Sequence, residues 1–177
     1  LYSRLENARQ LSEASISIHA RDIETMVEYA REELGYEEIY LVGHSLGALS
    51  IMNADVSGIK KIIYWDPSAG MRAIEDKKGA YDLDTGFYKL KWGLEIVISQ
   101  EMADEWSEAY ELKKYAKRIR GDCAFVFAGN YKKLKGAWIP GIEGKYPYSV
   151  VDGASHVFIE EGVIDELLEQ TLEFLES

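Results

Sequence analysis

The chain has 177 residues, 47% of them hydrophobic, which is the size and composition of one globular domain. Its formal net charge of −11 argues against nucleic acid or an anionic membrane surface as a partner, because phosphate groups would be repelled. No apolar run is long enough to span a membrane and no basic-then-apolar leader is present, so we expect a cytoplasmic protein.

The first predicted elements are a helix and a strand. Apolar residues recur at helical spacing over 18–34, and Gly35 follows where a left-handed C-cap would end the helix. The apolar run 39–42 predicts a strand that is covered on both faces.

A serine motif follows this strand directly. Residues 43–47 are Gly-His-Ser-Leu-Gly, a G-x-S-x-G sequence between the strand and a further helical pattern. The turn is so sharp that large side chains two positions from the serine would collide, which accounts for Gly43 and Gly47. It exposes the hydroxyl of Ser45 and leaves the backbone N–H of Leu46 free to bind an oxyanion. The motif predicts a nucleophile elbow, and the alternative is a Gly-rich turn with an incidental serine.

The next strand is predicted over 59–65, and the turn residues 66–70 end it. Two strands joined by a crossover helix indicate a parallel pair. Residues 71–120 then depart from the alternation of strand and helix. We interpret 71–120 as a helical cap insertion, and 1–70 together with 121–177 as the core domain.

The insertion is rich in aromatic and basic residues. We expect its aromatic side chains to line an apolar substrate pocket, although they could equally form the insertion's own small core. The basic residues between 113 and 120 follow Glu105, Glu108 and Glu111, which favours a solvated face over a binding patch. The aromatic residues of the insertion are Phe87, Tyr88, Trp92, Trp106, Tyr110 and Tyr115.

The remaining elements complete an α/β fold with a mostly parallel sheet flanked by helices. Residues 123–128 predict a buried strand that contains the single cysteine, Cys123, as a buried thiol. The Gly- and Pro-containing segment 129–147 predicts a long loop, and 148–151 a short final strand. The apolar pattern over 163–175 predicts an amphipathic helix that packs on the sheet.

A serine nucleophile needs a base, and histidine has the suitable pKa. The chain has three histidines. His44 adjoins the serine, where its side chain should diverge from it and line the pocket or support the turn, and His19 lies in a polar-faced helix. His156 follows the last strand, at the sheet edge that also carries the elbow. We therefore predict His156 as the base.

The elbow resembles that of the α/β-hydrolase family, and the resemblance covers nearly the whole chain. Many members carry the triad acid after the penultimate strand, but residues 128–133 contain no carboxylate. In a subset that includes the pancreatic and lipoprotein lipases, the acid follows the strand after the nucleophile, in a turn similar to 65–70. The resemblance thus implies Asp66, 21 residues after Ser45; alternatively, Asp66 only caps a turn before Pro67.

The resemblance implies a serine hydrolase that cleaves a carboxylic ester through an acyl-enzyme, a carboxylesterase or lipase-like activity with no metal or organic cofactor. The same residues would serve a thioesterase, a lactonase or a C–C bond hydrolase, because the pocket decides the substrate. A hydrolase-fold binding protein without turnover is the alternative outside the enzymes. His44, Trp92 and Trp106 are the candidate pocket residues.

The family normally has further strands before the first helix, and a loop after one of them supplies a second oxyanion donor. Nothing before Ile39 reads as a strand. We therefore expect the strand at 39–42 to need a partner for one edge, either a preceding segment or another copy of the chain.

Overall fold

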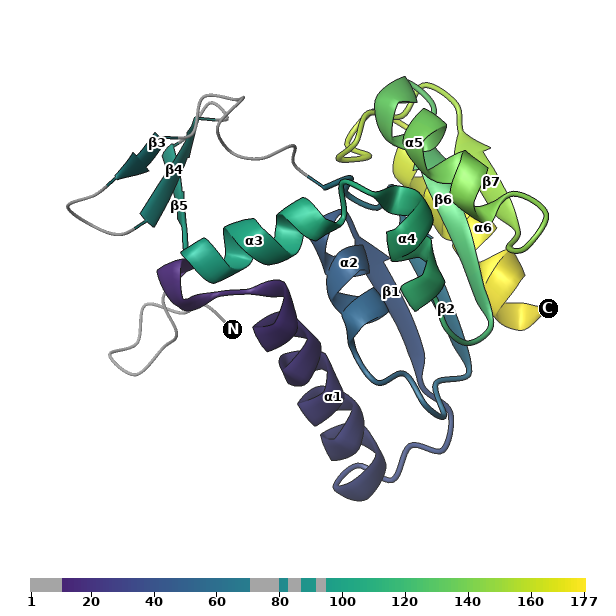
Figure 1. Ribbon diagram of the computed structural model, residues 1–177. Helices are drawn as coiled ribbons and strands as arrows, with labels where there is room; N and C mark the ends of the chain where they lie inside the picture. The colour runs from purple at the N-terminus through teal and green to yellow at the C-terminus, as the bar shows by residue number, and fades with distance from the viewer. Residues whose placement is uncertain (1–10, 71–79, 83–86, 92–94) are drawn as a thin grey trace.

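We describe residues 11–70, 80–82, 87–91 and 95–177 in a computed structural model of the chain. Its main sheet is parallel, with the strand order β1-β2-β6-β7 (Figure 1). The strands are β1 (Tyr40–His44), β2 (Lys61–Trp65), β6 (Cys123–Ala128) and β7 (Tyr148–Val151). All four agree with the predicted strands to within two residues at each end.

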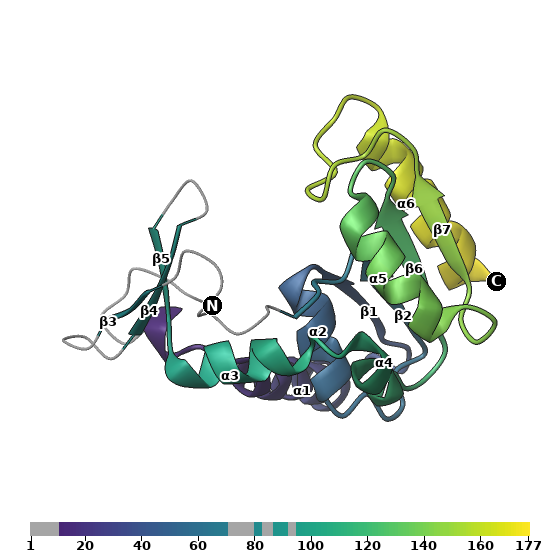
Figure 2. The ribbon, with the colours of Figure 1, turned by 45° about the horizontal axis from the view of Figure 1, so that its top comes forward.

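Helices cover both faces of this sheet because the side chains of each strand alternate between the faces. Ile62, Tyr64 and Phe125 belong to a large apolar cluster with one set of helices, whereas Ile63 and Val126 pack against α6 on the other face. Figures 1 and 2 show α2, α4 and α5 on one side of the sheet and α6 on the other. These helices are α2 (Leu46–Asn53), α4 (Leu112–Tyr115), α5 (Lys132–Ile142) and α6 (Val163–Glu176). The predicted α/β architecture is confirmed.

The first helix, α1 (Ile16–Glu32), packs on α2 and follows a short 3-10 turn, η1 (Leu11–Glu13). The hydroxyl of Ser15 caps it by accepting from the Ile18 amide at 3.1 Å. Gly35 has the predicted left-handed conformation, with φ of 72°, and the Tyr36 amide closes the end by donating to the Ala30 carbonyl.

The insertion contains more than helices. An antiparallel sheet of β3 (Ala80–Asp82), β4 (Phe87–Lys91) and β5 (Glu95–Ile98) precedes α3 (Gln100–Glu108), α4 and a 3-10 turn, η3 (Ala116–Arg118). Figures 1 and 2 show this small sheet beyond the first turn of α3, away from the main sheet. Residues 71–120 thus contain the helices α3 and α4, and also strands that the sequence prediction omitted, whose aromatic and β-branched residues favour extended chain. The division into a core and a cap insertion stays a prediction.

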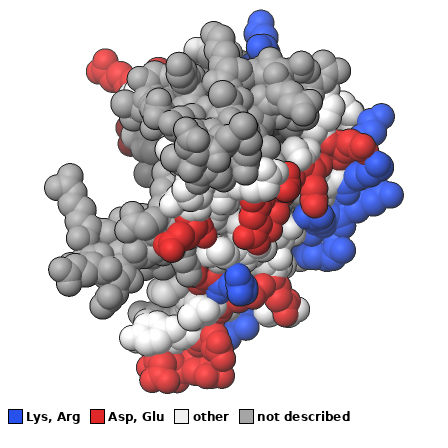
Figure 3. Space-filling model, turned by 60° about the vertical axis from the view of Figure 1, so that its left-hand side comes forward, with Lys and Arg blue, Asp and Glu red and all other residues white. Residues whose placement is uncertain are grey.

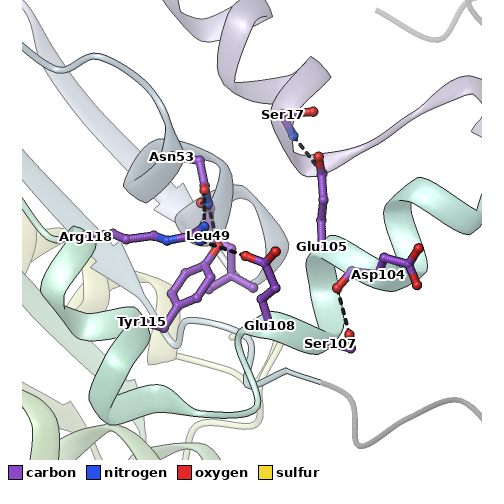
Figure 4. Close-up of polar contacts among 9 residues, drawn as sticks. All are labelled: Ser17, Leu49, Asn53, Asp104, Glu105, Ser107, Glu108, Tyr115 and Arg118. Atoms are coloured by element: carbon purple, nitrogen blue, oxygen red, sulfur yellow. Dashed lines mark hydrogen bonds and ion pairs between the residues drawn. The ribbon is translucent and has the colours of Figure 1, made fainter.

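Polar contacts fix α4 against α2 (Figure 4). The side-chain amide of Asn53, in α2, donates to the Leu49 carbonyl at 2.7 Å and to the hydroxyl of Tyr115. Arg118 donates to the Asn53 side-chain oxygen at 2.5 Å and pairs with Glu108 at 2.7 Å. The insertion is thus joined to the core by hydrogen bonds as well as by apolar contacts.

Residues 129–147 are not the predicted loop, since α5 occupies most of them. Leu134, Trp138 and Ile142 recur at four-residue spacing and are buried, so one face of the helix packs on the core. Pro140 lies in the last turn, where α5 ends two residues later. Tertiary burial of three apolar side chains outweighs the local preference of the glycines and the proline.

Two other sequence predictions concern single features. Cys123 is buried as expected, and desolvation raises the pKa of its thiol to about 12. No helix among the described residues is both long and apolar enough to cross a membrane.

Strand β1 has one strand neighbour within the described residues. It pairs with β2 in register from Tyr40 opposite Lys61 to His44 opposite Trp65. Val42 is 43% exposed, although the sequence predicted a strand covered on both faces. An unpaired strand edge offers N–H and C=O groups to another strand.

We expect the chain to self-associate through this edge. Val42→Lys should weaken the association, because a lysine on an edge strand opposes pairing. Sedimentation velocity at rising protein concentration would measure it. Tyr36→Lys, at a 60% exposed position outside the strand, is the matched control. Association that is equal in the wild type and in Val42→Lys would contradict the expectation.

Candidate active site

Ser45 occupies the turn between β1 and α2. Its φ of 54° and ψ of −117° are rare for a residue with a side chain. The Ser45 amide donates to the Trp65 carbonyl at 3.0 Å, and its carbonyl accepts from the Ser68 amide at 3.1 Å. These bonds tie the strained turn to the end of the neighbouring strand, so the surrounding structure maintains a conformation that the residue alone would avoid.

The two glycines of the motif have different surroundings. A Cβ at Gly43 would lie 2.6 Å from Ile51 Cδ1 and 2.9 Å from the backbone Cα of Ala48. A Cβ at Gly47 would meet no described atom within 4 Å. The predicted steric reason is therefore confirmed for Gly43 and wrong for Gly47, whose exposed position leaves room for a side chain.

Asp66 lies immediately after β2, beside Ser45. The parallel register places His44 opposite Trp65, so the residue after each strand end meets the other at the same sheet edge. Asp66 also has a positive φ, 38°, and its amide donates to the Val126 carbonyl at 2.8 Å. Its side chain is fully buried, and one carboxylate oxygen lies 3.4 Å from the Ala128 amide.

His156 lies between Ser45 and Asp66. Its Nδ1 is 2.5 Å from the Asp66 carboxylate and its Nε2 is 2.9 Å from the Ser45 hydroxyl oxygen. A carboxylate can only accept, so Nδ1 carries the proton and Nε2 is left to accept from the hydroxyl. The structure therefore brings together the three residues that the sequence predicted, in the order hydroxyl, imidazole, carboxylate.

The loop that carries His156 is held by the residues after β6, where many family members have their acid. The Asn130 amide donates to the Ala154 carbonyl at 2.9 Å, and its side-chain amide donates to the Gly153 carbonyl at 2.7 Å. An aspartate at 130 could not donate the second bond. Asn130, in the segment where many family members carry their acid, therefore holds the loop of His156.

His44 also contacts this loop. Its Nε2–H donates to the carbonyl of His156 at 2.7 Å, and its ring lies 4.9 Å from the His156 ring and 6.0 Å from that of Phe158. Phe158 has a positive φ of 51°. These contacts give His44 a role in holding the His156 loop, which differs from the predicted support of the elbow turn, and a role in the pocket stays a hypothesis.

Glu160 lies four residues beyond His156, at the end of the same loop. Hydrogen bonds from the Ser155 hydroxyl and then from the Ser155 backbone N–H lower the pKa of Glu160 below its usual value. Because the folded-state pKa is lowered, this contribution to stability is present above the ordinary glutamate pKa and is lost as pH falls through the lowered one. Glu160 is therefore ionised at neutral pH, while one of its carboxylate oxygens is buried without a hydrogen-bond partner among the described residues.

Of the two candidate pocket tryptophans, Trp106 packs against the turn at residues 66–70, which carries Asp66. Trp92 lies outside the described residues. Trp106 is buried, and its indole N–H lies 3.2 Å from both the Ser68 hydroxyl and the Ala69 carbonyl. Gly70 allows this turn to meet the insertion, since a Cβ there would lie 1.8 Å from the Tyr110 nitrogen. These contacts favour packing over recognition for Trp106.

Leu46 is the first residue of α2, so its amide has no acceptor within the helix. An amide N–H without an acceptor is what the predicted oxyanion role requires, and the role itself stays a prediction. Within the described residues, no group of three or more His, Cys, Asp or Glu side chains could hold a metal ion.

Sequence reasoning missed Asn130, Tyr131 and Glu160 around the histidine. The ring of Tyr131 lies 5.4 Å from that of His156. No sequence motif identifies these residues, because the groups that they contact become their neighbours only in the folded chain. The absence of a carboxylate at 128–133 was the one visible clue.

Substitution of the two motif glycines tests the elbow. Gly43→Ala should lower activity by about 10²-fold, the scale of a 1 Å misplacement, because the new methyl group collides with the Ala48 backbone and moves Ser45. Gly47→Ala is the matched control and should leave the fold and the Ser45 geometry unchanged. Circular dichroism and ester hydrolysis would measure both variants. Equal losses in the two would contradict the steric assignment.

No protein-family model matches the sequence, and neither does any curated protein. Solved structures match its fold at low identity. The esterase domain of a Rhodothermus marinus protein is 13% identical with a TM-score of 0.63, over 90% of this chain and 69% of that one. Est1E from Butyrivibrio proteoclasticus is 17% identical with a TM-score of 0.61, over 93% and 72%. Alpha/beta hydrolase domain-containing protein 10 from mouse is 14% identical with a TM-score of 0.65, over 99% and 75%. The chain therefore has the α/β-hydrolase fold.

Proposed function

We propose that the chain is a serine hydrolase that cleaves a carboxylic ester through an acyl-enzyme intermediate. The observation that carries the proposal is the hydrogen-bonded series from the Ser45 hydroxyl through His156 to the buried Asp66. With the carboxylate as acceptor at Nδ1, Nε2 faces the hydroxyl as the base that nucleophilic attack needs. The likeness to an esterase domain and to Est1E supports a hydrolase more broadly.

In the first half-reaction, the Ser45 oxygen attacks the ester carbonyl carbon while His156 Nε2 takes the hydroxyl proton. The carbonyl oxygen becomes an oxyanion, which the Leu46 amide stabilises. When the tetrahedral intermediate collapses, the C–O bond to the alcohol breaks and His156 returns the proton to the leaving oxygen. The acyl group remains on Ser45.

In the second half-reaction, water replaces the alcohol. His156 Nε2 takes a proton from the water as its oxygen attacks the acyl carbon, and the second intermediate collapses to release the acid and restore the Ser45 hydroxyl. The imidazole is positively charged in both intermediates. Asp66 is fully buried, so its charge acts on the imidazolium with little screening by water and holds Nδ1 in place.

A fluorophosphonate probe and two substitutions test the nucleophile and the base. The wild type should be labelled at Ser45, whereas Ser45→Ala and His156→Ala should not, because labelling requires an activated serine. Both variants should lose ester hydrolysis by comparable factors, on the order of 10⁴ to 10⁶. The double variant should be no slower than either single one, since the two residues act as a unit.

A panel of p-nitrophenyl esters of rising acyl length would supply the rates. Ser17→Ala is a control serine on α1, which contacts the insertion rather than the site. A wild type that is neither labelled nor active, although folded, would replace the proposal with a hydrolase-fold binding protein. Strict additivity of the two losses would reject the pairing of Ser45 with His156.

Asp66→Asn tests the orienting residue. The amide can donate to Nδ1, which favours the tautomer whose Nε2 carries the proton and cannot accept from Ser45. We expect a loss in kcat of about 10⁴ with the fold retained. Asp152→Asn, an exposed aspartate near the same histidine, is the control. Near-normal turnover in Asp66→Asn would assign the acid to another residue.

A further inference from the structure

Charge is unevenly distributed along this chain. Residues 112–151 contain nine of its 20 lysines and arginines and two of its 31 aspartates and glutamates, a formal charge of +7. The rest of the chain, whose total is −11, therefore carries −18. Figure 3 shows lysines and arginines gathered mainly at one edge, with carboxylates across much of the remaining described surface.

The basic segment contains α4 and α5, which lie together. A Cβ at Gly141, near the end of α5, would approach Ala116 Cβ to 3.3 Å, and Figures 1 and 2 both show α4 beside α5. Two cations of the α4 side are neutralised, because Arg118 pairs with Glu108 and Lys114 with Glu111. This agrees with the solvated face that the sequence predicted for residues 113–120.

The lysines at the start of α5 differ from that group. Lys132, Lys133 and Lys135, which we call the α5 lysines, have no ion-pair partner in the part of the chain that the structure describes. The first turn of α5 has no acidic residue, and its N-cap residue makes no side-chain cap. Positive charge at this end of a helix is unfavourable, so the fold itself gains nothing from them.

These lysines adjoin the candidate active site. Tyr131 directly precedes them, is 42% exposed, and its ring lies 5.4 Å from that of His156. Asn130, one residue earlier, binds the loop of His156. The first of the α5 lysines thus follows, by one residue, a side chain that lies against the imidazole of His156.

We propose that the ester substrate carries an anionic group, a carboxylate, phosphate or sulfate, which the α5 lysines attract to the mouth of the site. Asp152 and Glu160 flank His156 on its loop and oppose this attraction, so the α5 lysines would act on a small anion only at short range, within a Debye length of about 8–10 Å. An extended anionic surface would also be repelled by the carboxylates outside residues 112–151, where the formal charge is −18. A small anionic substrate is therefore favoured over a membrane or a polyanion. This inference rests on the proposed ester hydrolysis.

Matched ester pairs test the proposal. Mono-4-nitrophenyl adipate and 4-nitrophenyl hexanoate differ by a carboxylate on the acyl side, and 4-acetoxybenzoate and phenyl acetate differ by one on the alcohol side. In at least one pair, Lys132→Gln/Lys133→Gln should lower the anionic-to-neutral ratio of kcat/KM by about five-fold. This is the effect of removing two unit charges roughly 8 Å away in water. Added salt should lower the wild-type ratio in the same direction.

Lys113→Gln/Lys117→Gln is the control, with the same change in net charge on α4 and η3. Gly141, which contacts that region, lies nine residues beyond Lys132, or about 13 Å along a helix. The control should leave the ratio within about two-fold, since the distance exceeds a Debye length. Circular dichroism would verify that both double variants are folded.

Three results would overturn the proposal. One is a ratio that is unchanged by Lys132→Gln/Lys133→Gln in both pairs. Another is an equal change in the control, which would assign the effect to net charge. The third is lysine-dependent binding to phosphatidylglycerol vesicles with no change in either ratio, which would assign the surface to a membrane.

Labelling separates this inference from the proposed function. If the fluorophosphonate probe labels Ser45 and esters are cleaved without charge preference, the anionic substrate is wrong and the hydrolase stands. If the folded wild type is neither labelled nor active on any ester, both fail together.

Discussion

The parallel register between β1 and β2 is the constraint on which the candidate site depends. With His44 opposite Trp65, the residues that follow, Ser45 and Asp66, emerge side by side at the carboxyl edge of the sheet. The Ser45 amide and carbonyl then bond across the strand ends to Trp65 and Ser68. A slip of one residue in this register would break both bonds and turn one of the two side chains to the other face.

Backbone strain is concentrated at the same place. Among the described residues, the three with side chains and positive φ are Ser45, Asp66 and Phe158, one in each segment of the site. Such conformations cost of order 1–3 kcal/mol each and persist where the surroundings over-determine them. Here hydrogen bonds at Ser45 and Asp66 and the packing of Phe158 against His44 do so. Local backbone strain thus accompanies the arrangement in which the side chains of Ser45, His156 and Asp66 face one another.

The sequence predicted the strands of the main sheet and Ser45 from strong local signals, namely apolar runs and a G-x-S-x-G turn. His156 was predicted from its place after the last strand, and Asp66 only from the resemblance to a family, since an Asp-Pro turn has more than one structural meaning. Helix α5 was missed because its glycines and Pro140 are local signals that oppose the burial of Trp138 and Ile142. The support at Asn130 could not be predicted, since its partners Gly153 and Ala154 become neighbours only when the loops after β6 and β7 meet.

The residues of the candidate site are distant in the chain: His156 is 111 positions from Ser45 and 90 from Asp66. Contacts of such separation form only after much of the chain entropy has been lost, and parallel sheets order slowly for this reason. No fragment of local structure can assemble the hydroxyl, imidazole and carboxylate before β1, β2, β6 and β7 have paired. The proposed reactivity of Ser45 would consequently report the completed fold, and its recovery during refolding would follow the last strand pairing rather than the first helix.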